Sequence, residues 1–452
     1  MGQQQRFRAL QRSNIGGTPA WERLDPSLRE AIEVVSHVLP FRTNQYVVDE
    51  LIDWSKVPDD PIFQLTFPQR GMLADEHYER IHSLLKSGAD RAAIEAEATR
   101  IRLQLNPHPA GQMTHNVPML DGEAVPGVQH KYEQTVLFFP SQGQTCHAYC
   151  TFCFRWAQFV GMEDLKFASK ESERLADYLR SKPGVSDVLF TGGDPMIMKT
   201  AALRRYIEPL LSVESVQTIR IGTKAVGYWP QRFVTDDDAD DLLRLFEEII
   251  RSGRHVALMG HFSHPVELST KIAREAIARI RNTGANIRMQ SPIIRHVNDD
   301  ANAWAELWRQ GVRLGCVPYY MFVERDTGAK RYFELPLTRA WEIYCQAYQQ
   351  VSGLSRTVRG PVMSCFPGKV HVLGVVQLGN ERAIALQYLQ SRKPELTRRP
   401  FFAKYDPKAS WYDHLVPFSE ADRAFFLRES SMPTPPLISL KRNGTASIDV
   451  QN

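Results

Sequence analysis

Residues 146–153 read Cys146-His147-Ala148-Tyr149-Cys150-Thr151-Phe152-Cys153 and follow shortly after an apolar run at 136–140. Three cysteines in one short loop supply soft thiolate ligands for three of the four irons of a [4Fe–4S] cluster. The next cysteine in the sequence is Cys316, so this loop offers the fourth iron no ligand. An open iron can chelate the amino and carboxylate groups of S-adenosylmethionine, whose C5′–S bond an electron from the cluster can then break. We therefore expect the metal ligands to be Cys146, Cys150 and Cys153.

Two other interpretations of this loop stay open. The cysteines could be buried thiols, or they could form half of a zinc site. Zinc takes a fourth Cys or His at typical spacing, and the only such residue nearby is His147, which lies between two of the proposed ligands. The cluster is the favoured interpretation because the segments described below agree with it.

The composition excludes several classes of protein. The 452 residues carry 55 basic and 51 acidic side chains, so the net charge of +4 indicates neither a nucleic-acid partner nor a membrane surface. No apolar run approaches membrane-spanning length, and the N-terminus lacks the apolar core of a signal peptide. Six cysteines in a chain of this length do not suggest a disulfide framework. We expect a protein of the reducing cytoplasm, which an oxygen-sensitive cluster would also require.

The length suits two or three domains, and the sequence pattern changes along the chain. Residues 1–20 are polar and contain a Gly-Gly-Thr-Pro break, which predicts a flexible N-terminal arm. Residues 21–115 predict a helical N-terminal domain, with helices beginning at Asp25-Pro26 and covering 74–85 and 90–105. This domain contains no motif that suggests chemistry.

Residues 116–378 alternate between strand-like and helix-like runs. We expect strands at 135–140, 187–191, 217–222, 255–261, 286–290 and 315–322. We expect helices near 170–181, 200–211, 237–252, 266–284, 301–314 and 337–351. Six strand–helix units in succession predict an α/β fold with a parallel sheet and right-handed crossovers. In such folds the chemistry takes place at the carboxyl ends of the strands.

The pattern changes again after residue 378. Residues 380–430 mix helical and irregular segments with many aromatic side chains, and the stretch after Ser430 is rich in proline. We expect residues 379–452 to form a C-terminal arm that serves as a lid or an oligomerisation segment, with an extended end.

Taken together, the motifs resemble those of the lysine 2,3-aminomutase family of radical S-adenosylmethionine enzymes. The resemblance begins with the cysteine loop and Phe154-Arg155, followed by Phe190-Thr191-Gly192-Gly193-Asp194-Pro195. It continues through Arg220-Ile221-Gly222-Thr223, Gly260-His261-Phe262-Ser263-His264-Pro265, Gln290-Ser291, Val297-Asn298-Asp299 and Pro318-Tyr319-Tyr320. It covers about residues 35–378 and implies a partial (β/α)6 TIM-like barrel of the radical S-adenosylmethionine type.

The resemblance also implies an activity. In that family the cluster and S-adenosylmethionine generate a 5′-deoxyadenosyl radical, while pyridoxal 5′-phosphate holds the amino acid. The radical takes the β-hydrogen, and the amino group migrates from Cα to Cβ. We therefore expect an amino acid 2,3-aminomutase with these three cofactors, a reductant such as flavodoxin or ferredoxin, and a homo-oligomeric state.

The family motifs assign roles to individual residues. Gly192-Gly193-Asp194 matches the loop that contacts the amino group of S-adenosylmethionine, where a double glycine permits close backbone approach. Arg155 matches the residue that clamps the substrate carboxylate with forked donors, although a structural ion pair is the competing interpretation. Further positions expected to bind the cofactors are Thr223, His261, Gln290, Tyr132 and Tyr319.

The two pyridoxal phosphate motifs depart from the family pattern. The glycine-rich run that ends in the pyridoxal lysine is shorter here and ends in Lys369. Desolvation would lower the pKa of Lys369 and make it a Schiff-base former, the alternative being a solvated turn lysine. The phosphate segment His-Arg-Tyr-Pro-Asp-Arg appears as His130-Lys131-Tyr132-Glu133-Gln134-Thr135. Lys131 can still hold a phosphate as a point charge, whereas Thr135 cannot supply the second charge.

The expected substrate also shifts. Lysine-using members place an Asp shortly after the Tyr-Tyr pair, and that position holds Arg325 here; their other carboxylate is replaced by a small residue near Ser364. An arginine facing the substrate side chain would repel lysine and attract a carboxylate. We expect an acidic or neutral amino acid, with glutamate as the first candidate. The alternative is that Arg325 pairs with Glu324 and Asp326 on the rim.

Other outcomes stay open. No cysteine cluster follows Cys365, so we expect no structural zinc, and Cys316, Cys345 and Cys365 are predicted to be buried thiols, the last of them close to the site. Without pyridoxal phosphate, the protein would be a radical enzyme of the same family that performs epimerisation or lysine modification. A non-catalytic iron–sulfur protein is the third possibility.

Overall fold

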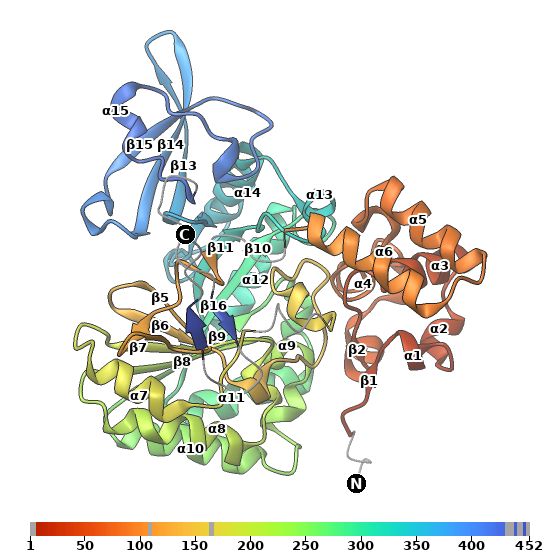
Figure 1. The fold of residues 1–452 in the computed structure, drawn as a ribbon, viewed down its shortest axis with the longest axis horizontal. Coiled ribbons are helices and arrows are strands. Elements are labelled where there is room, and N and C mark those ends of the chain that lie inside the picture. The colour runs from red at the N-terminus through yellow and green to blue at the C-terminus, as the bar shows by residue number, and fades with distance from the viewer. Residues whose placement is uncertain (1–5, 107–110, 162–166, 430–437, 441–445, 449–452) are drawn as a thin grey trace.

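The computed structural model describes residues 6–106, 111–161, 167–429, 438–440 and 446–448 of the chain. The first part is helical, as expected, and stands beside the rest of the molecule in Figure 1. The predicted helices are α3 (Pro26–Val35), α5 (Asp75–Lys86) and α6 (Arg91–Gln104), joined by a shorter helix α4 (Pro61–Thr66). Capping sets the start of α3, since the Asp25 carboxylate accepts a hydrogen bond from Ser27 N and Pro26 occupies the first turn.

The expectation of a flexible arm does not hold for residues 6–20. Strand β1 (Ala9–Leu10) pairs antiparallel with β2 (Thr43–Asn44), and two short helices follow, α1 (Arg12–Ile15) and α2 (Pro19–Glu22). Leu10 is 0% exposed and Ile15 is 1% exposed, so these apolar side chains anchor the segment to the N-terminal core. Residues 1–5 lie outside the described part of the chain.

One sheet of eleven strands forms the body of the molecule, and each strand lies beside its neighbour in sequence. In order, the strands are β5 (Val128–Tyr132), β6 (Thr135–Phe138), β7 (Asp187–Phe190), β8 (Thr218–Thr223), β9 (His255–His261), β10 (Asn286–Ile293), β11 (Val317–Val323), β12 (Arg359–Ser364), β13 (Gly368–Leu378), β14 (Glu381–Ser391) and β15 (Pro400–Lys404). Strands β6 to β12 are parallel, and the pairs at the two ends are antiparallel. The α/β class and the six expected strands, β6 to β11, are therefore confirmed, while closure into a partial barrel stays a prediction.

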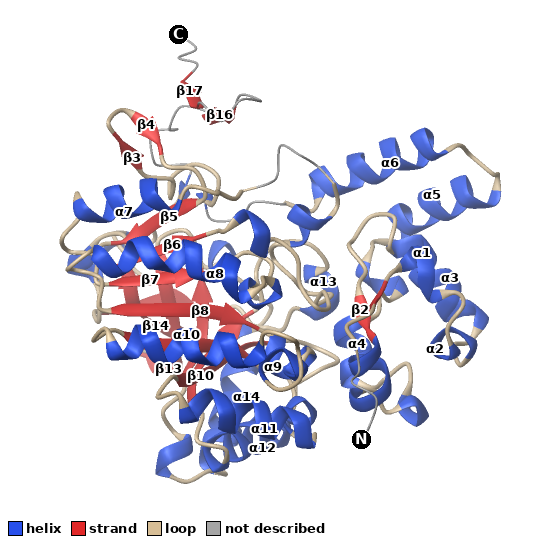
Figure 2. Cartoon of the chain, turned by 90° about the horizontal axis from the view of Figure 1, so that it is seen from below, coloured by secondary structure: helices blue, strands red, loops and turns tan. Residues whose placement is uncertain are grey.

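The predicted helices follow the parallel strands. They are α7 (Ser172–Arg180), α8 (Thr200–Ile207), α10 (Ala239–Arg251), α11 (Lys271–Asn282), α12 (Ala301–Arg313) and α14 (Leu337–Gln349). Figure 2 shows α7, α8 and α10 lying across one face of the neighbouring strands. Strand β8 illustrates the alternation that results, because Ile219 and Ile221 are fully buried in the helix-covered core, whereas Arg220 and Gly222 line a cavity on the opposite face.

The sequence analysis missed part of the sheet. Residues 359–364, for which no strand was predicted, form the seventh parallel strand β12, and much of 380–430, expected to mix helical and irregular segments, forms β14 and β15. A tight turn at Gly379, with φ +60°, joins β13 to β14. The aromatic residues of this region pack into a core of their own with Tyr388, Phe401 and Trp411. A role as a lid or an oligomerisation segment stays a prediction.

Across the described ranges, none of the helices combines the length and the apolar character that crossing a bilayer would require.

Candidate active site

A cavity of about 630 Å³ lies at the carboxyl ends of the parallel strands. Every residue assigned to the site from sequence lines it: Cys146, Cys150, Cys153, Arg155, Lys131, Tyr132, Gly192, Gly193, Asp194, Thr223, His261, Gln290, Tyr319, Arg325 and Lys369. These residues come from segments more than 200 positions apart in sequence. A single cavity therefore gathers all the motifs.

The N-terminal helices hold the cysteine loop through backbone contacts. Tyr149 N donates to the carbonyl of Arg42 at 2.7 Å, and Thr151 N donates to the carbonyl of Leu65 at 2.9 Å. Asn44, which is 0% exposed, donates its side-chain amide to the carbonyl of His147 at 3.2 Å. Because buried backbone groups need partners, these bonds fix the path of the loop between its cysteines.

The three thiols lie together in an environment that favours the neutral form. Burial raises the pKa of Cys150 to about 12 and that of Cys153 to about 11, and the neighbouring cysteines add to both the Cys146 and the Cys150 shifts. Within the described residues, no three His, Cys, Asp or Glu side chains converge on a point where one metal ion could bind. A cubane places each thiolate on a different iron, so its ligands need not converge on a single point.

His147 does not complete a zinc site with these cysteines. Its ring is stacked on Trp229, with centroids 6.4 Å apart, and meets the Phe7 ring edge-on at 5.3 Å. Burial lowers the pKa of His147 to about 3. This histidine is therefore a core residue, and the half-zinc interpretation has no support from the geometry.

The double-glycine loop packs directly on the start of the cysteine loop. Gly192 has φ +146°, and a Cβ on Gly193 would lie 2.4 Å from the carbonyl oxygen of Thr145. The Asp194 carboxylate accepts hydrogen bonds from Met196 N, Thr223 Oγ1 and Lys224 N, each at 2.9 Å. Asp194 therefore ties the end of β7 to the end of β8, and its expected contact with S-adenosylmethionine stays a prediction.

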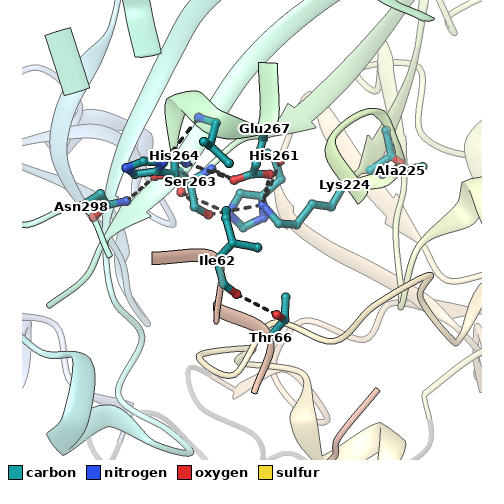
Figure 3. A network of polar contacts seen from close by, with 12 residues as sticks. Ile62, Thr66, Lys224, Ala225, His261, Ser263, His264, Glu267 and Asn298 are labelled. Atoms are coloured by element: carbon teal, nitrogen blue, oxygen red, sulfur yellow. Dashed lines mark hydrogen bonds and ion pairs between the residues drawn. The ribbon is translucent and has the colours of Figure 1, made fainter. Parts of the chain in front are cut away.

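A buried ion pair lies beside His261. Lys224 Nζ is 2.6 Å from Glu267 Oε2, and Figure 3 shows Lys224 reaching towards Glu267 and Ser263. Glu267 is 0% exposed and also accepts hydrogen bonds from Ser263 N and His264 N. Burial and the Lys224 charge hold the pKa of His261 well below its usual range, so its ring is neutral, and it lies 3.3 Å from Ser291 Oγ.

Lys369 has the environment of a reactive amine. Its Nζ is 2.8 Å from Gln390 Oε1, 4.9 Å from the Tyr320 ring centroid and 5.7 Å from that of Tyr132. Burial and the charges of Arg220 and Arg359 lower the pKa of Lys369 to about 7. The lysine lies in β13 and lines the cavity, so it is not a solvated turn residue.

Lys131 and Tyr132 lie close to Lys369 in the cavity wall. Lys131 Nζ donates to the backbone carbonyl of Cys365, and burial holds its pKa well below the ordinary value. The Tyr132 hydroxyl is buried and has no partner among the described residues. Cys365 is buried and borders the site, and Cys316 is buried, but Cys345 is only half-buried because it lies on the partly exposed face of α14.

Two arginines approach each other in the same cavity. Arg155 lies 3.9 Å from the Phe139 ring centroid, and its Nη1 is buried with no hydrogen-bond partner in the described part of the chain. Burial, together with the charge of Arg325, lowers the pKa of Arg155 to about 9. Arg325 lies 5.0 Å from the Phe154 ring centroid, inside the cavity and not on an exposed rim. Both oxygens of Glu324 are buried without a hydrogen-bond partner among described residues, so Glu324 does not bond Arg325, whereas the charge of Asp326 acts on Arg325 and opposes the lowering of its pKa by burial.

Basic side chains outnumber acidic ones along the cavity wall. Seven basic side chains line it, namely Lys131, Arg155, Arg220, Lys224, Arg325, Arg359 and Lys369, against two acidic ones, Asp187 and Asp194. Such a wall favours anionic ligands. The sequence analysis missed Arg220, Lys224 and Arg359 as site residues. Alternation with buried Ile219 and Ile221 could have placed Arg220 in the cavity, but no sequence signal marked Arg359.

Comparisons with known proteins give a consistent result. A search of family models finds no match. The chain is 30% identical over 393 residues to a candidate L-lysine 2,3-aminomutase of Aquifex aeolicus, covering 87% of this chain and 92% of that protein. It is 28% identical over 219 residues to the L-lysine 2,3-aminomutase of Clostridium subterminale, covering 48% of this chain and 50% of that enzyme.

Solved structures are more distant. A radical SAM methyltransferase of Sphaerobacter thermophilus gives a TM-score of 0.37 at 14% identity, over 65% of this chain and 94% of that one. The structure of Streptococcus suis SuiB bound to its precursor peptide gives a TM-score of 0.34 at 12% identity, over 63% of this chain and 61% of that one. We draw no conclusion from scores this low. The relationship to the Aquifex aeolicus protein extends over most of both chains, so this chain belongs to the lysine 2,3-aminomutase family of radical S-adenosylmethionine enzymes.

Proposed function

We propose that the protein is a pyridoxal-phosphate-dependent amino acid 2,3-aminomutase whose substrate is an acidic amino acid, with glutamate as the first candidate. The observation that carries this proposal is the composition of the cavity wall: a buried lysine with a pKa near 7 and two converging arginines share one space with the cysteine loop. A reductant such as flavodoxin or ferredoxin and a homo-oligomeric state belong to the proposal.

The cysteine loop and the strand ends suit the first two cofactors. A cluster held by Cys146, Cys150 and Cys153, with S-adenosylmethionine on its open iron, would supply a radical that abstracts hydrogen. The close packing of Gly193 on Thr145 brings the loop after β7 to the cluster side of the cavity. The donor set is appropriate, because three thiols are present and no disulfide forms between them.

Lys369 suits the third cofactor. Pyridoxal phosphate, when bound, supplies an electron-delocalising ring that stabilises an adjacent radical. An amine adds to its carbonyl group only when neutral, and a pKa of about 7 leaves a large neutral fraction at physiological pH. Gln390 orients the amine by accepting its hydrogen bond, and Tyr132 and Tyr320 flank it with apolar ring faces.

The two arginines select the substrate. Arg155, with an unpartnered buried nitrogen, is suited to bind the α-carboxylate through its forked donors. Arg325 then faces the side chain, where it attracts a second carboxylate and repels an ammonium. Seven basic groups against two acidic ones would make the same cavity costly for the cationic side chain of lysine.

The experiment begins with anaerobically prepared protein that carries a reconstituted cluster. Pyridoxal phosphate is added, the mixture is reduced with borohydride, and the adduct is located by peptide mass. We expect the adduct on Lys369, none in Lys369→Ala, and an unchanged yield in the exposed control Lys170→Ala. Turnover is then measured with glutamate, aspartate and lysine by detection of the β-amino acid. Clear turnover of lysine with none of glutamate would reject the acidic substrate.

A second candidate is a radical enzyme of the same family that works without pyridoxal phosphate, catalysing epimerisation or lysine modification. The observations that favour it are Thr135 in place of the phosphate-binding arginine and the engagement of Lys131 with the Cys365 carbonyl. Protein that cleaves S-adenosylmethionine but forms no adduct on Lys369 would support this second candidate.

A further inference from the structure

Thr135 occupies the position that matches the second arginine of the family's phosphate segment, and a positively charged side chain lies nearby. Thr135 opens β6 and is the register partner of Asp187 on β7. The Asp187 carboxylate accepts a hydrogen bond from Arg220 Nε at 2.7 Å, so the guanidinium on β8 reaches the start of the neighbouring strand β7. Only Nε takes part in that bond, and Arg220 still lines the cavity. Arg220 therefore supplies a positive charge beside the position where the sequence lacks one.

A second guanidinium lies on the other side of Lys369. Arg359, on β12, is the register partner of Tyr320, and its central carbon lies 4.6 Å from the ring centroids of both Tyr319 and Tyr320. Within the described part of the chain, no hydrogen bond or ion pair joins Arg359 to another side chain. Stacking on rings holds a guanidinium by its faces and leaves its in-plane N–H groups available to a ligand.

Both guanidiniums lie near the amine of Lys369. Each charge contributes to the lowered pKa of that lysine, while Asp187 opposes the shift, which means that all three groups are within electrostatic reach of the amine. The Tyr320 ring touches both Arg359 and Lys369. Two cations about one reactive lysine form a receptor for a dianion, since paired guanidiniums match phosphate oxygens in geometry as well as in charge.

We propose that Arg220 and Arg359 bind the phosphate of a pyridoxal phosphate attached to Lys369, and that they replace the arginine that Thr135 has displaced. This inference rests on the proposed function. Asp187 acts as a positioning residue, because its bond to Nε turns the remaining N–H groups of Arg220 towards the cavity. Lys131 contributes less, since its ammonium already donates to the carbonyl of Cys365.

The test compares two ligands that differ only in the phosphate. Anaerobically prepared, cluster-containing protein is titrated with pyridoxal phosphate and, separately, with pyridoxal, and binding is followed by absorbance and by borohydride-trapped adduct. Arg359→Gln should weaken pyridoxal phosphate binding about 10- to 100-fold, the loss expected for one charge-assisted contact, and should leave pyridoxal binding unchanged. Arg359→Lys should restore part of the affinity.

Arg288→Gln is the matched control. Arg288 lies on β10 and contacts the same Tyr319 ring, at 6.0 Å, but it does not line the cavity. The substitution Arg288→Gln removes one positive charge near the same tyrosine, and it should change the affinity for neither pyridoxal phosphate nor pyridoxal. Inorganic phosphate should compete with pyridoxal phosphate in the wild-type protein and less effectively in Arg359→Gln. Thermal unfolding of each variant checks that the fold is retained.

The outcomes separate the inference from the function on which it rests. If the wild-type protein forms the Lys369 adduct and Arg359→Gln binds both ligands as well as the wild type does, the phosphate assignment is overturned while the aminomutase proposal stands. Equal weakening of both ligands would also overturn it, because the arginine would then act on the ring. Wild-type protein without any Lys369 adduct would reject the proposed function itself.

Discussion

Gly193 and Thr145 are packed so closely that the loop after β7 and the cysteine loop form one unit: a Cβ on Gly193 would lie 2.4 Å from the Thr145 carbonyl oxygen. The same oxygen accepts a hydrogen bond from Asp194 N at 2.7 Å. The residue that precedes the first cysteine is thus held by the second strand of the parallel sheet. Any side chain at position 193 must displace the cysteine loop.

Gly193→Ala should therefore lose its cluster. We expect iron and sulfide content after reconstitution to fall several-fold and the free energy of unfolding to fall by roughly 1–3 kcal/mol, as for an overpacked site. The control is Gly184→Ala, where the new Cβ would lie no closer than 3.6 Å to its neighbours and should be tolerated. Normal cluster content in Gly193→Ala would show that the two loops can separate.

The capture of pyridoxal phosphate by Lys369 should depend on pH. With a pKa of about 7, the amine is mostly protonated below that pH and neutral above it, so the rate of adduct formation should rise through pH 7 and level off above pH 8. The measurement is the initial rate of borohydride-trapped adduct from pH 5.5 to 9. A rate that still rises steeply at pH 9, as the ordinary lysine pKa of about 10.4 requires, would mean that the amine is not desolvated.

Exchanging the charge at position 325 should change the substrate preference. Arg325→Asp removes the attraction for a side-chain carboxylate and introduces attraction for an ammonium. We expect kcat/KM for glutamate to fall about 100-fold and that for lysine to rise, since each buried charge contact contributes about 1.5–3 kcal/mol. Arg331→Gln, at an exposed position on the nearby helix α13 (Lys330–Phe333), should leave both values unchanged. An unaltered ratio in Arg325→Asp would place the side-chain site elsewhere.

Breaking the ion pair of Lys224 with Glu267 should cost stability. Glu267→Gln keeps the shape but leaves the Lys224 ammonium, whose side chain is only 10% exposed, without its counter-charge. We expect a loss of roughly 3–5 kcal/mol in denaturant unfolding, and partial recovery in the double variant Lys224→Met/Glu267→Gln.

An exposed pair provides the comparison for that loss. The pair of Arg423 with Glu420 has side chains 72% and 81% exposed, and Glu420→Gln should change the free energy of unfolding by less than about 1 kcal/mol. Similar effects at the two positions would mean that solvent reaches the Lys224 ammonium in the folded protein.

Sequence reasoning succeeded where the signal was local. Strands β6 to β11 are short apolar runs bounded by turns, and the cysteine spacing marks its own loop. Strand β14 was not predicted because Ala383-Ile384-Ala385-Leu386 lacks the alternation of apolar and polar residues that marks a half-exposed strand. All four side chains are buried, so the sequence shows no period of two. The strand that contains Leu10 was not predicted because it pairs with residues more than 30 positions away, and because two residues are too few to show a periodic pattern.

The cavity shows the same limit. Arg155 and Lys369 were predicted because they adjoin recognisable motifs. Arg220 also belongs to a motif, but its proximity to Lys369, like that of Arg359, arises only in the folded sheet. The position of Arg359 depends on its register with Tyr320, and that register could not be predicted because no strand was expected at residues 359–364. When the folded sheet brings together charged side chains from strands that are distant in sequence, no local sequence pattern predicts that they will be close.

The backbone bonds between the N-terminal helices and the cysteine loop set an order of assembly. Tyr149 N and Thr151 N find their acceptors, Arg42 and Leu65, on a segment synthesised about a hundred residues earlier. If the loop needs these bonds to hold its shape, we expect iron insertion to follow the docking of the N-terminal domain on the cysteine loop. A fragment consisting of the sheet alone would retain all three cysteines and yet be a poor acceptor for a scaffold that delivers clusters.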